Sequence, residues 1–272
     1  MFLKKIALLA LLLMNGVFGI TQNSGFDKGS MVYIPEGNYL PLYSGNSQPE
    51  QVAGFYIDRL PVTNHDFQAF VRENPQWGKT GIKKLFADEG YLKYWNNNLE
   101  IDAVLKQSPV VNVSWFAAQK YCECLGKRLP TTAEWERVAA AGRTMENGRN
   151  EPGFQQWILD MASKLQQKPL PAVGQTMKNY YGVWDMHGLI WEWTYDFNTA
   201  LTTGESRGNS SLDNTLFCGG GSFQSGDVEN YAAFLRYAMR SSLKAKHVLQ
   251  NLGFRCAGDK VSGDLGTGRL RK

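Results

Sequence analysis

The strongest local signal in this chain is a helix start at Thr131. Its hydroxyl can cap the first turn, and Glu134 can reach back to the Thr131 backbone, which is the capping-box pattern. Trp135, Val138 and Ala139 then share one apolar face, and the pattern ends before a glycine, residue 142. The sequence therefore predicts a short helix after Thr131 with one buried face.

Two more helices carry similar start signals, and a further one is expected at residues 153–166. Thr63 with Asp66 predicts a helix over 64–72. Ser114 predicts another, ending at Gly126. The buried face of this second helix is expected to hold Ala118, Tyr121, Cys122 and Leu125.

The remaining elements are predicted to be short strands separated by turns. A turn-rich loop is expected over residues 35–51. The strands are expected at residues 31–34, 55–57, 190–194, 216–223, 238–240 and 253–257. No repeat or composition break divides the chain, so we expect one α+β domain over residues 31–257 and a flexible tail over 258–272.

Residues 1–19 are typical of a secretory signal. Lys4 and Lys5 precede an apolar run over 6–13 that is too short to span a bilayer. A short buried helix is the alternative interpretation. Residues 20–30 would form a polar leader. We expect a periplasmic or secreted protein that contacts a membrane only through an uncleaved signal segment.

The charge of the chain is small. The formal net charge is +4 and falls to +2 once Lys4 and Lys5 are removed with the signal. A balance this close to zero gives no indication of nucleic-acid binding.

Four cysteines form an even set in this expected exported protein: Cys122, Cys124, Cys218 and Cys256. Two disulfides with three connectivities are the first interpretation. A metal site at Cys122 and Cys124 is the alternative, although their spacing is not the usual one for zinc.

An oxygen-rich turn suggests a different metal. Two carboxylates and two backbone carbonyls lie within eight residues and could supply the oxygen ligands that calcium prefers. They belong to Asp185, Gly188, Ile190 and Glu192. The alternative is a turn whose acids cap backbone amides and pair with arginines.

Several motifs in order along the chain resemble one known family, the formylglycine-generating enzymes or sulfatase-modifying factors. The most specific motif is Gly126-Lys-Arg-Leu-Pro-Thr-x-Ala-Glu-Trp-Glu136. Others are Met31-Val-x-Ile-Pro35, Asn112-Val-Ser-Trp115, Tyr181-Gly-Val-Trp-Asp-Met-His-Gly188 with Trp191-Glu-Trp-Thr194, and Asn251-Leu-Gly-Phe-Arg-Cys-Ala257. The resemblance implies a single modified C-type-lectin-like fold.

The resemblance also implies roles for particular residues. Cys122 and Cys256 match a disulfide of family members, which leaves Cys124 and Cys218 for a second bridge. The turn that contains Asp185 and Glu192 matches a structural calcium site.

The reactive centre of the family has no counterpart here. In family members two cysteines between the glycine-rich run and the closing arginines bind copper, but no cysteine lies between Ser222 and Ser241. Serine and alanine cannot replace thiolates for Cu(I). Formylglycine formation by the known copper mechanism is therefore not expected. The stretches 217–221 and 232–237 resemble the NirV-type proteins associated with copper-containing nitrite reductase.

A binding cleft is what the resemblance leaves in this region. Its expected residues are Ser222, Phe223, Asp227, Tyr231, Arg236, Tyr237 and Arg240. Arginines and tyrosines on a rigid frame suit a polar or peptide ligand. The alternative is that Arg236, Arg240 and Arg255 are structural ions paired with Asp185, Glu134 or Glu136.

Three functions are compatible with these features. The first is a non-oxidase accessory or maturation factor that binds another exported protein, with copper nitrite reductase as a candidate. The second is a metal-dependent oxidoreductase resembling the PvdO branch, acting on a peptide-derived substrate. The third is a structural lectin-like module. The three histidines, His65, His187 and His247, have no close ligand spacing, and His187 is expected to form a local hydrogen bond.

Overall fold

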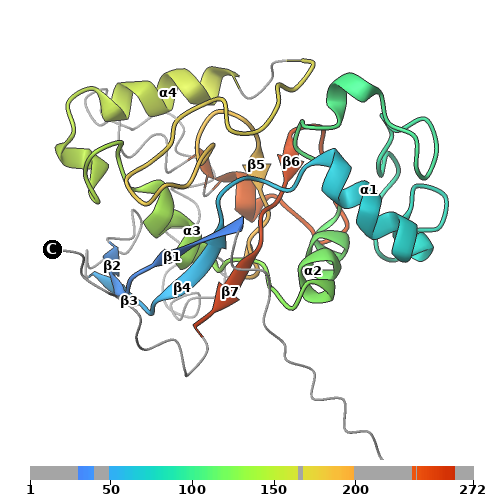
Figure 1. Ribbon diagram of the computed structural model, residues 1–272, viewed down its shortest axis with the longest axis horizontal. Helices are drawn as coiled ribbons and strands as arrows, with labels where there is room; N and C mark the ends of the chain where they lie inside the picture. The colour runs from blue at the N-terminus through green and yellow to red at the C-terminus, as the bar shows by residue number, and fades with distance from the viewer. Residues whose placement is uncertain (1–29, 40–48, 165–167, 199–234, 237, 261–272) are drawn as a thin grey trace, which may run out of the picture.

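The computed structural model describes residues 30–39, 49–164, 168–198, 235–236 and 238–260 (Figure 1). The predicted signal over 1–19, almost all of the leader, the predicted strand over 216–223 and most of the tail lie outside these residues. Five of the seven expected cleft residues also lie outside: Ser222, Phe223, Asp227, Tyr231 and Tyr237.

The central sheet joins the two ends of the domain. β1 (Met31–Ile34) pairs antiparallel with β4 (Phe55–Asp58), and β4 pairs antiparallel with β7 (Ala257–Asp259). The predicted strands at 31–34 and 55–57 are confirmed. β7 continues to Asp259, two residues beyond the end of the domain expected from the sequence.

Two smaller sheets accompany the central one. β2 (Gly37–Tyr39) pairs with β3 (Glu50–Val52), so the expected loop over 35–51 contains a strand pair and that prediction is wrong at its ends. β5 (Trp191–Glu192) runs parallel to β6 (Leu252–Gly253), which brings the Trp-Glu-Trp motif beside the C-terminal motif.

The helices begin where the capping signals predict. Thr63 caps α1 (Asn64–Glu73), Ser114 caps α2 (Trp115–Cys124), and Thr131 caps α3 (Thr132–Ala139). Both capping boxes are formed. α4 (Phe154–Lys164) fills the predicted 153–166 segment. Short 3₁₀ turns lie at Pro75–Trp77 (η2), Ala103–Leu105 (η3) and Gly148–Asn150 (η4).

Two further predictions about local structure are wrong. Leu125 is 46% exposed, because α2 ends at Cys124 and the chain turns away before the apolar face reaches it. Residues 238–240 are helical, not a strand. The helical spacing places Arg236 and Arg240 on one face, where both meet the same carboxylate.

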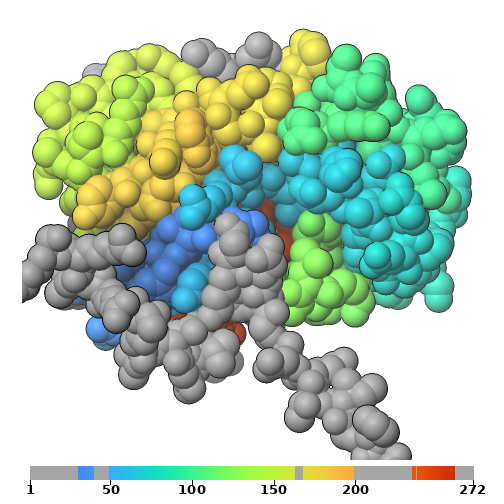
Figure 2. Space-filling model, viewed as in Figure 1, coloured from blue at the N-terminus to red at the C-terminus, as the bar shows by residue number. Residues whose placement is uncertain are grey.

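Two apolar clusters fill the interior. In the first cluster, α1 and α2 pack against residues from three separate parts of the chain, Trp95, Trp193 and Phe254. In the second cluster, α3 packs against β1 and β4. In Figures 1 and 2, α4 lies at the upper left, above the central strands, and α1 lies to their right. Among the described residues, none of the helices has the length and apolarity needed to cross a bilayer. The mixed helix and sheet architecture confirms the α+β prediction and is consistent with a C-type-lectin-like description.

One disulfide crosses the first cluster. Cys122 in α2 is bonded to Cys256, just before β7, and both residues are fully buried. This confirms the pairing that the family resemblance implied. It also rules out the alternative in which Cys122 and Cys124 hold a metal, because Cys122 has no free thiol.

Candidate functional site

The two expected cleft residues within the described part, Arg236 and Arg240, both bind Glu136 of α3. Nε and Nη2 of Arg236 donate to the Glu136 oxygens at 3.0 and 2.9 Å, and Nη1 of Arg240 donates at 2.5 Å. Each of the three side chains is less than 15% exposed. The structure therefore shows the ionic pairing with Glu136 that sequence reasoning held as the alternative to ligand binding.

The charge of Glu136 depends on these arginines. Burial alone would raise the pKa of the Glu136 carboxyl, but attraction to Arg236 and Arg240 and their hydrogen bonds outweigh it and lower the pKa to about 2. The carboxylate is therefore ionised throughout the physiological range. It holds the helical residues 235–236 and 238–241 against α3.

Trp135 connects the cluster of Glu136, Arg236 and Arg240 to the protein interior. Its ring lies 5.0 Å from the Arg240 guanidinium and 6.0 Å from that of Arg236. Its indole nitrogen donates to the Glu192 carboxylate at 2.9 Å. Two neighbouring residues of α3 therefore contact two different ionic groups. Trp135 donates to Glu192, and Glu136 pairs with Arg236 and Arg240.

Glu192 is occupied by Arg255. Nε and Nη2 of Arg255 donate to the two oxygens of Glu192 at 2.7 Å each, and neither side chain is exposed. With the indole of Trp135, three N–H groups point at one carboxylate. Arg255 also donates to the carbonyl oxygen of Trp184 at 2.9 Å.

Asp185 is satisfied in the same way. Its side chain accepts from the amide of Thr176 at 3.0 Å, from the Thr176 hydroxyl at 2.8 Å and from the amide of Gly174. A calcium ion needs oxygen lone pairs directed at it, and these are directed at N–H and O–H donors. Both carboxylates expected to bind calcium, Asp185 and Glu192, are thus engaged by protein donors, which argues against the site expected there with the carbonyls of Gly188 and Ile190. Their contacts match the alternative of acids that cap amides and pair with an arginine.

His187 lies in the same turn, and its ring packs in the protein interior. One ring nitrogen is 2.8 Å from the carbonyl oxygen of Ala139, and the rings of Trp135, Phe154 and Trp157 meet its ring edge to face. Burial, with a smaller contribution from Arg236, lowers the pKa of His187 to about 4. It is neutral at pH 7. The predicted hydrogen-bonding role is confirmed, but the bond is not local, because Ala139 lies 48 residues away in sequence.

The other candidate metal ligands are separate. The side chain of His65 is 59% exposed, and His247 accepts a hydrogen bond from the backbone of Lys244. Cys124 is exposed and forms no disulfide with any described residue, whereas its expected partner Cys218 lies outside them. That second bridge stays a prediction. No group of three or more potential ligands among histidine, cysteine, aspartate and glutamate occurs in the described part of the chain.

Sequence reasoning missed Tyr39 of β2 as a neighbour of this cluster. Its hydroxyl donates to Glu50 at 3.3 Å. Burial, then the nearby charges of Glu50 and Glu136, raise the pKa of Tyr39. The signal that could have located it is absent from the sequence, because the strand pair that carries Tyr39 lies in a stretch without alternating apolar residues.

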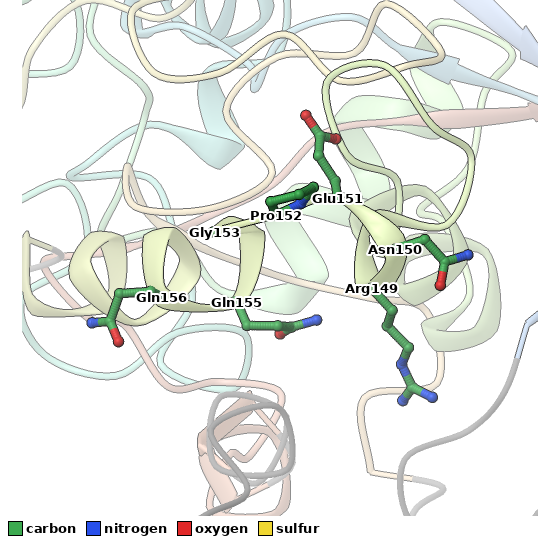
Figure 3. A pocket seen from close by; sticks show the side chains of 7 residues that line it. All are labelled: Arg149, Asn150, Glu151, Pro152, Gly153, Gln155 and Gln156. Atoms are coloured by element: carbon green, nitrogen blue, oxygen red, sulfur yellow. The ribbon is translucent and has the colours of Figure 1, made fainter.

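A shallow, open pocket of about 540 Å³ lies at η4 and the start of α4 (Figure 3). It is lined by Arg149, Asn150, Glu151, Pro152, Gly153, Gln155 and Gln156. Figure 3 shows the side chains of Arg149, Glu151 and Gln156 pointing in different directions. They do not converge on a ligand, and no expected site residue is among them.

Comparisons with known proteins agree with these motifs. A family model described as the sulfatase-modifying factor enzyme 1-like domain matches residues 19–260. The formylglycine-generating enzyme of Streptomyces coelicolor is 33% identical, with 83% of each chain covered. The mouse protein named inactive C-alpha-formylglycine-generating enzyme 2 is 27% identical over 84% of this chain and 85% of its own.

Other similarities are partial or more distant. The chain matches the serine/threonine-protein kinase Pkn1 of Chlamydia trachomatis with 27% identity over 61% of its residues, and it spans only 28% of that protein. Among solved structures, PvdO from Pseudomonas aeruginosa is 18% identical, with 85% of this chain and 94% of that chain covered and a TM-score of 0.43.

Proposed function

Because this chain belongs to the family of sulfatase-modifying factor enzyme 1-like proteins, we propose that it is an exported member that does not oxidise but binds another exported protein. It would act as an accessory or maturation factor. The observation that carries the proposal is the absence of any cysteine between Ser222 and Ser241 in a chain that otherwise keeps the family's motifs.

The remaining cysteines do not offer a substitute pair. Cys122 and Cys256 are consumed by a buried disulfide, and Cys124 is at the exposed end of α2. A Cu(I) site requires soft thiolate ligands held together, and no two thiols meet among the described residues. The proposed function therefore does not include oxidation of a substrate by a bound copper ion.

The structure beside the region that lacks the copper cysteines favours the binding of a ligand. Glu136 holds Arg236 and Arg240 in place, and we propose that this fixed helical segment bounds the cleft. A rigid support lowers the entropy lost when a ligand is ordered. The similarity to a mouse relative whose name describes it as inactive is compatible with a family frame that persists without the oxidation.

The ligand we propose is an extended segment of an exported protein, and copper nitrite reductase is the specific candidate. The Cys122–Cys256 disulfide supports export, because disulfides persist in oxidising compartments. The narrower resemblance to NirV-type proteins stays a prediction. Calcium has no part in the proposal because its expected ligands are occupied by donors.

Two measurements on the full chain test the proposal. Copper-loaded protein incubated aerobically with a cysteine-containing sulfatase peptide should yield no aldehyde by mass spectrometry. Surface plasmon resonance against purified copper nitrite reductase should show binding that weakens at least about tenfold in Asp227→Ala/Tyr231→Ala, as for loss of central contacts.

Lys106→Ala, on an exposed residue after η3, is the matched control and should bind normally. Aldehyde formation would contradict the non-oxidase assignment. Metal at one equivalent together with turnover of a peptide-derived substrate would instead support a PvdO-type oxidoreductase. Absence of binding would remove nitrite reductase as the partner.

A further inference from the structure

A turn at residues 83–86 presents an exposed leucine on a fixed base. The amide of Phe86 donates to the carbonyl of Lys83 at 2.8 Å, and Leu85 between them is 73% exposed. The ring of Phe86 lies 5.5 Å from those of both Trp77 and Phe116. Because these aromatic contacts anchor Phe86, the turn is held in one place with Leu85 in solvent.

A second stretch of chain, residues 244–250, lies beside this turn. The amide of Asp88 donates to the carbonyl of Lys246 at 2.8 Å, and the Lys246 ammonium is 2.9 Å from the Asp88 carboxylate. A methyl group at Gly90 would lie 3.7 Å from Cδ of Lys93 and 3.8 Å from Cγ2 of Val248. The two stretches therefore share one surface.

Lysines dominate this surface. We call it the lysine-rich face and define it by Lys83, Lys84, Leu85, Lys93, Lys244 and Lys246, all exposed. The acidic side chains on the same stretches are Asp88, which pairs with Lys246, and Glu89. Five lysines against two acids give the face a positive potential and suit an anionic partner.

We propose that the lysine-rich face docks on an anionic lipid surface, with Leu85 entering the headgroup region. Basic side chains around an exposed apolar tip are what an interfacial contact requires, since the lysines meet lipid phosphates while the leucine leaves water. An acidic protein would be bound better by a recess, whereas Leu85 stands on the tip of a turn. The proposal is independent of the cleft and of the missing cysteines.

Sedimentation of the full chain with vesicles tests it. Affinity for vesicles of phosphatidylglycerol and phosphatidylcholine is compared with affinity for phosphatidylcholine alone. Residues 1–19 are the same in every variant, so their contribution does not distinguish them. Lys83→Glu/Lys84→Glu should lower the anionic-to-neutral preference by at least about 25-fold, at about fivefold per lysine near a charged surface.

Leu85→Ser should weaken binding to the anionic vesicles by about tenfold, because its apolar side chain no longer enters the interface. Val104→Ser and Lys106→Glu are the matched controls, because Val104 is 76% exposed and both residues lie at η3, outside the face. Their binding should equal that of the unmodified chain. An anionic preference that is absent, or that the face variants and the η3 variants change equally, would overturn the proposal.

Discussion

The indole nitrogen of Trp135 donates a hydrogen bond to the carboxylate of Glu192 at 2.9 Å, deep in the protein. A face of the same indole contacts the guanidinium of Arg240, whose charge is balanced by Glu136. One residue of α3 thus joins the buried Glu192–Arg255 pair to the Glu136–Arg236–Arg240 cluster. This relationship makes the stability of that cluster dependent on ionic groups far apart in sequence.

Replacing Glu136 should destabilise the protein strongly. Glu136→Gln leaves Arg236 and Arg240 largely buried without their carboxylate, which we expect to cost about 3–5 kcal/mol of unfolding free energy. Urea denaturation measures it. Glu123→Gln removes a solvent-exposed partner of Lys120 and should cost less than about 1 kcal/mol. Equal effects of the two substitutions would show that the buried cluster is not stabilising.

The same carboxyl should produce an acid-dependent loss of stability. The pKa of this carboxyl is about 2 in the folded protein against an ordinary value of 4.5, so the unfolded chain binds the proton first. The stabilisation is fully present above pH 4.5 and is lost as the pH falls toward 2, by about 3 kcal/mol in total. Unfolding free energies over this range should fall more steeply for the unmodified chain than for Glu136→Gln. Parallel curves would contradict the assignment.

His187 should make the stability of the protein depend on pH over a range higher than that of Glu136. Burial holds the pKa of His187 at about 4 against an ordinary value of 6.5, so the unfolded chain again takes up the proton first. Stability should therefore decline as the pH falls from 6.5 to 4, and His187→Gln should show no decline of that origin. Melting temperatures recorded across this window for both proteins provide the measurement. His65→Gln, at an exposed histidine, serves as control and should retain the decline.

Calcium should have no effect on the melting temperature. Arg255 supplies the positive charge beside Glu192, and Thr176 and Gly174 satisfy Asp185. Scanning fluorimetry in excess EGTA and in excess calcium should give the same transition. A lower melting temperature in EGTA that calcium restores, and that Asp185→Ala abolishes, would show that the ion binds after all.

The buried disulfide should contribute substantially to stability. Cys122 and Cys256 are 134 residues apart, and closing a loop of that length corresponds to about 4–5 kcal/mol in the chain-entropy model. Cys122→Ser/Cys256→Ala should lower the unfolding free energy by up to this amount in chemical denaturation. Iodoacetamide mapping of the native chain should leave both residues unlabelled. Labelling of either one under non-reducing conditions would be inconsistent with the bridge.

The sequence by itself determined the local elements that depend on near neighbours. The caps at Thr63, Ser114 and Thr131 act over three residues, so the start of each of these helices can be predicted without knowledge of the fold. Ordered motifs identified the family and the Cys122–Cys256 bridge. The missing thiols between Ser222 and Ser241 are also a property of sequence alone.

Only the tertiary structure decided which partner each charged residue takes. Glu192 and Arg255 are 63 positions apart, and Glu136 and Arg236 are 100 apart. The family resemblance, together with the spacing of oxygens around Asp185 and Glu192, predicted calcium, because neither shows the donors that other segments bring to these carboxylates. Side-chain charge is encoded locally, but its compensation in a buried site depends on long-range packing, which a pattern of neighbouring residues does not contain.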